Sequence, residues 1–492
     1  MFLTVSPATY WNRRNKAVER NEDSNIEMVK EISKKQLFGF VLAAIILVGM
    51  FFFPEVSSLS HAGVKTVGIV LAFLVILITE ALPLTVICWT FLGLMPLLGV
   101  TQTFSAALTG FSNPVVFFIL SSSGIAAGFT VLPLSRRILV VLLNRFGKNV
   151  SSMLFAIMLC NTVISSIVSS VPTCTVFLAI SLSFLDLYDN EEDRKRAGRA
   201  FMIGVPLTSM IGGMMTPAGS SINLLAIGLL EKFTGQTITF VQWMIVGVPL
   251  TIVTLPVAWF ILIKVYKPAE INPGLVKSFT TRLDISPKIS VPEVRVLIIT
   301  GIMLVFWILS SWFRGINIMV VALIGCCALF LPKLGVLEWK PFIKTLNFDP
   351  FFLVGTVLCI GDAMVQNGVS DWVITLLPTF NMPVIILVGF SVLLVFVMLV
   401  FIPVAPSLVT LMATPLIAMA TGMGFSAPMI ILTLALCAGN CYLLPLDTIP
   451  LIAYSTGYFS MTDMPKSTAW IQVFLVFVMA LWIPFACGLL GM

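Results

Sequence analysis

The sequence predicts an all-α polytopic membrane protein built from two inverted repeats, each with a re-entrant hairpin and an interrupted transmembrane helix. Of its 492 residues, 59% are hydrophobic and 10% are charged, whereas about 25% of the residues of a soluble domain are charged. Apolar stretches long enough to span a bilayer recur along the chain. Prolines interrupt these stretches at matched places in the two halves.

The composition also excludes several classes of function. The net charge of +6 does not indicate a nucleic-acid partner, because the positive residues follow a topological pattern described below. The chain has one histidine, His61, so neither a His-based metal site nor a Ser-His-Asp triad is expected. No phosphate-binding Walker sequence is present, which disfavours an ATP-driven pump. We therefore expect no catalytic residue, no metal site and no organic cofactor.

The first half of the chain alternates apolar spans with short polar segments. Residues 1–36 are polar and basic and are expected to form a cytoplasmic tail. The elements expected after this tail are spans at 37–53, 64–80, 83–100 and 113–131, an interfacial amphipathic helix at 134–146, a hairpin at 150–187, a charged loop at 189–199, a span at 200–232 interrupted at 216–221, and a span at 240–264.

The second half follows the same course after a proline-containing polar linker, residues 265–294. Its expected elements are spans at 295–312, 316–332 and 348–367, an amphipathic stretch at 370–377, a hairpin at 383–420 with its tip at 403–407, a span at 428–457 interrupted at 444–450, and a last span at 468–488. The domain division is thus 37–264, the first span plus the first repeat, and 295–492, the second repeat.

Matched prolines indicate an internal duplication. The offsets between the halves lie between 228 and 236 residues. The pairs are Pro114 and Pro350, Pro172 and Pro406, and Pro217 and Pro445. Proline has no N–H and clashes with the preceding helical turn, so each pair marks a helix start or break.

Positive charge predicts the orientation of the repeats. If the N-terminus is inside and both hairpins are re-entrant, three of the 28 Lys and Arg residues fall outside: Lys65, Lys232 and Arg314. This topology puts the first hairpin on the cytoplasmic side, the second on the outside, and the C-terminus outside. Inverted repeats with paired broken segments are typical of secondary transporters.

The breaks carry the candidate binding residues. No Lys or Arg lies within the expected hydrocarbon core, so a bound anion must be held by hydroxyls, backbone N–H groups and helix N-termini. Each hydroxyl taken alone is more often structural, whereas the set at the breaks favours binding. The candidate substrate-binding residues are Ser169, Ser170, Thr173, Thr175, Thr216, Ser220, Asn223, Ser407, Thr410 and Thr448.

Asp447 is the one acid inside a predicted break. Acids at membrane depth are costly and are usually functional. Asp447 is a candidate for coupling, through a cation or a proton, and capping of the following helix is an equally good interpretation. Glu80 lies at a span end and favours a structural role, while the role of Asp362 stays open at this point.

The motifs resemble those of the divalent anion:sodium symporters, which carry dicarboxylates, citrate or sulfate. The matching stretches are Ile78 to Leu84 (ITEALPL), Gly212 to Gly219 (GGMMTPAG), and Asn223 in the place of the final Asn of the family's Thr-Pro-Pro-Asn. The order of elements matches over nearly the whole chain. The resemblance implies a homodimer in which a scaffold holds a moving transport domain that works as an elevator.

Both hairpin tips depart from the family's Ser-Asn-Thr. They align as Val171-Pro172-Thr173 and Ala405-Pro406-Ser407, with Pro in place of each Asn, and the second Thr-Pro-Pro-Asn becomes Thr448 to Leu451. In the family these Asn residues help bind the substrate and sodium. The departures therefore leave open which anion is carried and whether sodium or a proton is the coupling ion.

The sequence thus predicts a secondary active transporter of small organic anions, di- or tricarboxylates, in the cytoplasmic membrane. The alternatives are a sodium-independent anion exchanger and a proton-coupled carrier of another anion such as sulfate. A membrane-embedded enzyme is disfavoured, because the chain lacks His pairs and acidic metal clusters. The expected partners are the anion, the lipid bilayer and a second copy of the chain.

Overall fold

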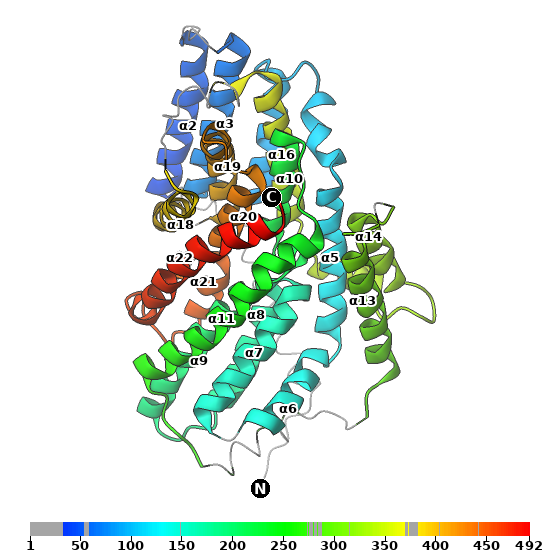
Figure 1. The fold of residues 1–492 in the computed structure, drawn as a ribbon, viewed down its shortest axis with the longest axis vertical. Helices are drawn as coiled ribbons and strands as arrows, with labels where there is room; N and C mark the ends of the chain where they lie inside the picture. The colour runs from blue at the N-terminus through cyan, green and yellow to red at the C-terminus, as the bar shows by residue number, and fades with distance from the viewer. Residues whose placement is uncertain are drawn as a thin grey trace, which may run out of the picture.

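The computed structural model describes residues 33–53, 59–147, 149–272, 288–313, 315–369, 382–402, 404–440 and 442–492, with single residues at 274, 279, 283 and 372. Within these residues, nine helices are long and apolar enough to cross a membrane, and several shorter apolar helices accompany them. The expectation of an all-α polytopic membrane protein is confirmed. Figure 1 shows an elongated arrangement of tilted helices.

One end of the molecule is formed by helices from the start of the chain together with α16. These are α2 (Lys34–Phe52), α3 (His61–Thr79), α4 (Leu84–Leu97), η1 (Ala106–Ser112) and α16 (Asp349–Gln366). α2 packs along α3, and both α4 and η1 pack against α16. Side chains fix α16 in place, because Thr85 donates to Asp349 at 2.6 Å and Asn367 donates to Thr66 at 2.7 Å.

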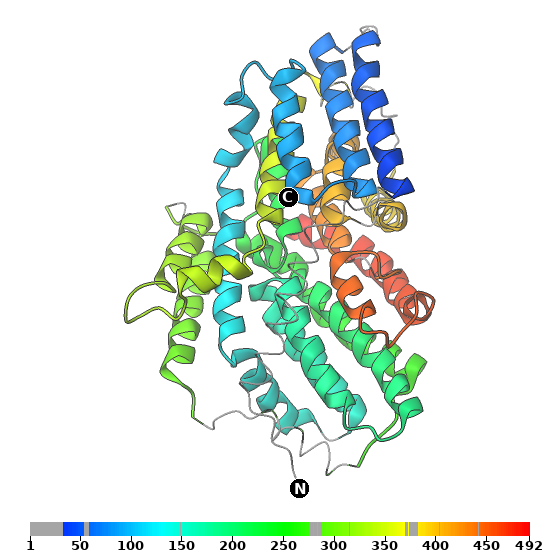
Figure 2. The same ribbon diagram turned by 180° about the vertical axis from the view of Figure 1, so that it is seen from behind.

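α5 (Pro114–Val131) runs from this end toward the middle of the molecule, and two helices flank it on one side in both views (Figures 1 and 2). These are α13 (Val291–Leu309) and α14 (Ile318–Ala328), with the short α15 (Trp339–Thr345) beside them. α6 (Leu134–Phe146) follows α5 and carries the predicted amphipathic pattern. Its Arg137 pairs with Glu293 of α13 at 2.8 Å.

The first hairpin and the first interrupted helix form one packed group. Its elements are α7 (Val150–Val168), α8 (Ser170–Leu185), α9 (Glu191–Gly213), η2 (Pro217–Gly219), α10 (Ser221–Thr234) and α11 (Phe240–Tyr266). A single residue, Ser169, joins α7 to α8, with φ of 83° and ψ of 147°. α7 and α9 approach closely at Gly212, where a Cβ would lie 2.3 Å from the carbonyl oxygen of Thr162.

The second hairpin and the second interrupted helix form a matching group. Its elements are α18 (Val384–Phe401), α19 (Ala405–Gly422), α20 (Ala427–Ala438), α21 (Thr448–Tyr454) and α22 (Asp463–Leu489). Pro406 lies in the first turn of α19 and Pro172 in the first turn of α8. Proline is tolerated there, because the first-turn N–H groups have no partner within the helix.

The two groups pack against each other reciprocally. α7 and α8 both pack on α9, and α18 and α19 both pack on α20. The helix after the first break, α10, packs on α19 and α20, while the helix after the second break, α21, packs on α8 and α9. The interrupted helix of each group therefore packs against the hairpin of the other group.

Two expected elements differ from the structure, and a third falls outside the described residues. The segment 189–199 is not a loop, because α9 begins at Glu191; Asn190 caps it and three acids occupy its first turn, where the helix dipole favours them. The second interruption runs from Gly439 to Asp447, so it begins earlier than expected. The amphipathic stretch expected at 370–377 lies outside the described residues except for Trp372.

Candidate functional site

The first break is held together by hydroxyls that bond to backbone groups. Thr216 caps η2 by accepting from the N–H of Gly219 at 3.1 Å, and it donates to the carbonyl of Ser166 in α7. Ser170, the first residue of α8, donates to the carbonyl of Gly219 at 3.2 Å. The tip of the first hairpin and the first break are therefore one connected unit.

Asn223 follows the first break in the chain and forms hydrogen bonds back to backbone groups that precede it. Its carboxamide nitrogen donates to the carbonyls of Gly213 and Thr216 at 2.8 and 3.0 Å. These two bonds use both N–H groups of Asn223, so only its oxygen remains for another partner. Ser220 caps α10 by accepting from the N–H of Ile222 at 3.3 Å, and its own O–H remains available to the space beside it.

The second break provides the other part of the candidate site. α20 ends at Ala438, and Gly439 and Asn440 follow it. Asp447 occupies the N-cap position of α21, but its side chain forms no capping hydrogen bond. The side chain of Asp447 is half-buried. Its carboxylate accepts instead from the backbone N–H of Thr448, the first residue of α21, so capping and coupling both stay open as interpretations.

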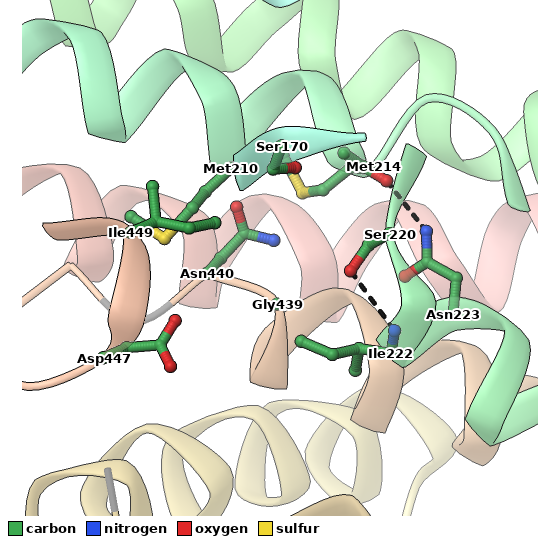
Figure 3. Close-up of a pocket in the computed structure, with 11 residues that line it drawn as sticks. Ser170, Met210, Met214, Ser220, Ile222, Asn223, Gly439, Asn440, Asp447 and Ile449 are labelled. Atoms are coloured by element: carbon green, nitrogen blue, oxygen red, sulfur yellow. Dashed lines mark hydrogen bonds between the residues drawn. The ribbon is translucent and has the colours of Figure 1, made fainter. Parts of the chain in front are cut away.

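A small enclosed cavity lies where these pieces meet (Figure 3). Its volume is about 20 Å³, which is room for about one water molecule. Its lining comes from the first tip, the first break and the second break. The lining residues are Ser170, Met210, Gly213, Met214, Ser220, Ile222, Asn223, Gly439, Asn440, Asp447 and Ile449.

Four of the residues singled out from the sequence line this cavity: Ser170, Ser220, Asn223 and Asp447. They lie far apart in the chain and are brought together by the packing of α10 on α20 and of α21 on α8. Thr216 does not line the cavity, but it is linked to it through Asn223, which donates to the Thr216 carbonyl. The two breaks therefore meet at one place in the fold.

The other candidates do not line the cavity. Ser169 forms the strained joint of the first tip, and Thr173, which is buried, donates back to its carbonyl at 2.8 Å. Thr175 lies on the exposed side of α8, and Thr448 is exposed at the start of α21. The last two candidates belong to the second tip, Ser407 and Thr410. None of the described residues of that tip lines the cavity, so the N-terminal ends of α8, α10 and α21 meet there without that of α19.

Ser407 is one of several buried polar side chains without a hydrogen-bond partner among the described residues. Its side chain is fully buried, and its hydroxyl has no hydrogen-bond partner among the described residues. Thr410, one turn later, donates to the carbonyl of Pro406 at 2.8 Å. A buried hydroxyl without a partner costs free energy, so Ser407 remains a candidate for contact with a ligand in another conformation.

Sequence reasoning missed Asn440. This residue is buried, lines the cavity and follows directly on the end of α20. Two methionines at the end of α9, Met210 and Met214, were missed as well. Asn440 could have been found from the sequence, because it is a single carboxamide that follows a long apolar run and lies five residues before Pro445, which marks the second break.

The charge of the site is unusual for an anion-binding cavity. Among the described lining residues there is no Lys, Arg or His, and there is one carboxylate, that of Asp447. Favourable potential for an anion comes from the N-terminal ends of α8 and α10, which carry partial positive charge. An anion bound beside Asp447 therefore needs a cation or a proton as a companion.

Comparison with known families agrees with this architecture. A family model described as the sodium:sulfate symporter transmembrane region matches residues 34–491, almost the whole chain. The protein belongs to this family. The resemblance that the motifs indicated is therefore confirmed, and with it the assignment to a family of membrane transporters.

Two relatives of this sodium:sulfate symporter family member show distant similarity to it. A membrane protein of Cupriavidus necator is 24% identical over 352 residues, 68% of each chain. The sodium-dependent dicarboxylate transporter SdcS of Staphylococcus aureus strain NCTC 8325 is 24% identical over 377 residues, 72% of each chain.

Two solved structures share the fold. The MtrF protein of Neisseria gonorrhoeae, described with a class of antimetabolite efflux pumps, has a TM-score of 0.57 and 11% identity, and the match covers 93% of this chain and 95% of MtrF. The YdaH transporter of Alcanivorax borkumensis has the same TM-score and identity, covering 93% of this chain and 99% of YdaH. At this identity the likeness establishes the fold alone.

Proposed function

We propose that the protein is a secondary active transporter that moves small organic anions, di- or tricarboxylates, across the cytoplasmic membrane. The observation that carries this proposal is the cavity at the meeting of two interrupted helices, where helix N-termini, hydroxyls and carboxamides face one space. Discontinuous helices meeting near the middle of a membrane are how many transporters hold their substrates. SdcS, the staphylococcal relative, is a sodium-dependent dicarboxylate transporter.

The reciprocal packing of the two groups supports two inverted repeats, residues 37–264 and 295–492, joined by the linker 265–294. Hydrogen bonds tie α16 to α3 and α4 at one end of the molecule, whereas both breaks belong to the two hairpin groups. This division supports an elevator mechanism, in which the hairpins and interrupted helices move as one body. It also fits a homodimer held by the static body, with the N-terminus inside and the C-terminus outside.

The cavity is too small for a dicarboxylate as it stands, so transport requires it to widen. Widening involves separation of the first tip, at Ser170, from the second break, at Asn440 and Asp447. In the opened site Asp447 carries the coupling proton, so that sodium is dispensable. Sodium symport and sodium-independent exchange are the competing coupling modes.

Uptake into proteoliposomes tests the proposal. Purified protein is reconstituted, and uptake of labelled succinate, citrate and sulfate is measured with a sodium gradient, with a pH gradient, and with internal unlabelled anion alone. We expect succinate or citrate to accumulate with the pH gradient without sodium. Accumulation that occurs only with sodium would overturn the coupling mode, and no uptake of any anion under the three conditions would overturn the proposed function.

A further inference from the structure

Asn440 lines the cavity from the second break and is almost completely buried, with 1% of its surface exposed. Figure 3 shows it between Asp447 and Ser170, with its carboxamide nitrogen turned toward the side where Ser220 lies. It belongs to neither hairpin tip. A carboxamide in this place is a second polar group, besides Asn223, that reaches the same space from the opposite interrupted helix.

The hydrogen bonds of Asn440 fix which of its atoms faces the cavity. Its nitrogen donates to the carbonyl of Leu436, one turn back in α20. Its oxygen accepts from the hydroxyl of Tyr442. Because a carbonyl can only accept, the nitrogen must lie on the Leu436 side. A carboxamide has two N–H groups, so among the described residues one N–H of Asn440 has no partner and remains for a ligand.

Asn440 and Asn223 therefore offer opposite groups to the cavity, the first a hydrogen-bond donor and the second an acceptor. Asn223 uses both N–H groups to close the first break and offers only its oxygen, which repels an anion. Asn440 uses its oxygen and one N–H and offers a donor. Both hairpin tips carry Pro in place of the family's Asn, so each tip has lost N–H donors. Among the described lining residues there is no Lys or Arg. The cavity therefore has few side chains other than Asn440 that could donate to an anion.

We propose that Asn440 is a substrate-contacting residue whose free N–H donates to a carboxylate oxygen of the transported anion, and that Tyr442 is the positioning residue that holds this orientation. The inference rests on the proposed function, because it concerns the same site. Tyr442 is fully buried and does not line the cavity, so its effect on the anion passes through Asn440. Without its hydroxyl the carboxamide is free to turn and present its oxygen.

The test is a double-mutant cycle on substrate affinity. Asn440→Ala removes the donor and raises the apparent KM for the anion about tenfold, the size expected for one hydrogen bond to a charged group. Tyr442→Phe keeps the ring but loses the hydroxyl and raises the KM by a smaller factor. In the double variant the Tyr442→Phe effect disappears, because there is no carboxamide left to orient. Asn440→Asp, which places a second carboxylate in the cavity, weakens binding most.

A structural role would give a different pattern. It would lower the maximal rate and the melting temperature in detergent while leaving the KM unchanged. Tyr454→Phe is the matched control, because it also removes a phenol hydroxyl from the second group, and Tyr454 is not among the residues that line the cavity. We expect this control to match the wild type in KM.

The outcomes separate the two proposals. Wild-type protein that transports none of the anions overturns the proposed function itself. Wild-type protein that transports an anion, together with an Asn440→Ala variant of unchanged KM, overturns this inference and leaves the proposed function standing. Additive effects of Asn440→Ala and Tyr442→Phe on the KM would overturn the positioning role of Tyr442.

Discussion

Lys232, near the end of α10, forms an ion pair with Asp362 of α16. Thr109 of η1 donates to the other carboxylate oxygen of Asp362 at 2.9 Å. The pair is largely shielded, with 25% of the Lys232 side chain and 13% of the Asp362 side chain exposed. It connects the helix that begins at the first break to a helix of the body that contains α3 and α4. The role of Asp362, open from the sequence, is therefore that of a shielded ion-pair partner.

Removing one member of this pair should destabilise the protein. Lys232→Met leaves the carboxylate of Asp362 with the Thr109 hydroxyl but without its cation, and we expect a loss of about 1–3 kcal/mol in the free energy of unfolding. Asp362→Asn should cost less, because its amide oxygen still accepts from Thr109. Thermal melting in detergent measures both. A double variant as unstable as the sum of the singles would show that the two side chains do not interact.

Close helix contact at Gly212 gives a second stability prediction. A Cβ at this position would lie 2.3 Å from the carbonyl oxygen of Thr162, and backbone atoms cannot move aside as a flexible side chain can. Gly212→Ala should therefore force α7 and α9 apart and cost about 1–3 kcal/mol. Gly301→Ala in α13 is the control, because nothing lies within 4 Å of its Cβ position. Equal melting temperatures for the two variants would contradict the close approach of α7 and α9 at this point.

The two tip hydroxyls should respond differently to removal. Thr173→Val breaks the bond to the Ser169 carbonyl and should cost about 0.5–1.5 kcal/mol of stability. Ser407→Ala removes a buried hydroxyl that has no partner among the described residues, so stability should be unchanged or higher. If Ser407 meets the substrate in another conformation, its removal raises the apparent KM about tenfold. A Ser407→Ala variant with normal KM would exclude it from the binding site.

The sequence predicted the positions of most helices because each begins or ends at a strong local signal. Pro172 and Pro406 mark first turns, and Thr216 and Ser220 mark caps. The start of α9 was missed because its first residues are charged, which resembles a loop. A first turn of acids behind Asn190 is in fact a favourable helix start.

The site was predicted less completely than the fold. Residues on the breaks, such as Ser220 and Asn223, can be found because hydroxyls and carboxamides are out of place in apolar spans. The same criterion selects Thr173 and Thr175, but one bonds to its own tip and the other faces outward. Asn440 was missed because the second break starts at Gly439, before the prolines that mark it. Which face a hydroxyl takes depends on packing between segments far apart in the sequence.

Membrane topology gives a prediction that needs no substrate. The inverted-repeat proposal places the segment before α13 on the cytoplasmic side, where Lys288 is exposed. In a cysteine-free background, a Cys at position 288 should resist a membrane-impermeant maleimide in intact cells and react after the cells are opened. A Cys replacing Met492 should react without opening. Labelling of position 288 from outside would contradict the inverted orientation of the two halves.

Asp447 gives the most direct test of coupling. It is the one carboxylate among the described residues that line the cavity, and no positive side chain accompanies it in that lining. A dianion beside an ionised Asp447 is repelled, whereas a protonated Asp447 removes the repulsion and can donate a hydrogen bond. Asp447→Asn mimics the protonated acid in shape and charge. We expect this variant to lose accumulation driven by a pH gradient but to keep exchange of labelled for unlabelled anion.

The contrast between accumulation and exchange is what makes this variant informative. A variant that had simply misfolded would lose both activities, and Asp447→Ala, which keeps no hydrogen-bonding group, should weaken exchange as well. The measurement is uptake into proteoliposomes at a fixed internal pH, with the external pH varied, and then counterflow with equal pH on both sides. Intact pH-driven accumulation in Asp447→Asn would show that the proton travels elsewhere. Asp447 would then serve only the local structure of the second break, although its side chain forms no capping bond there.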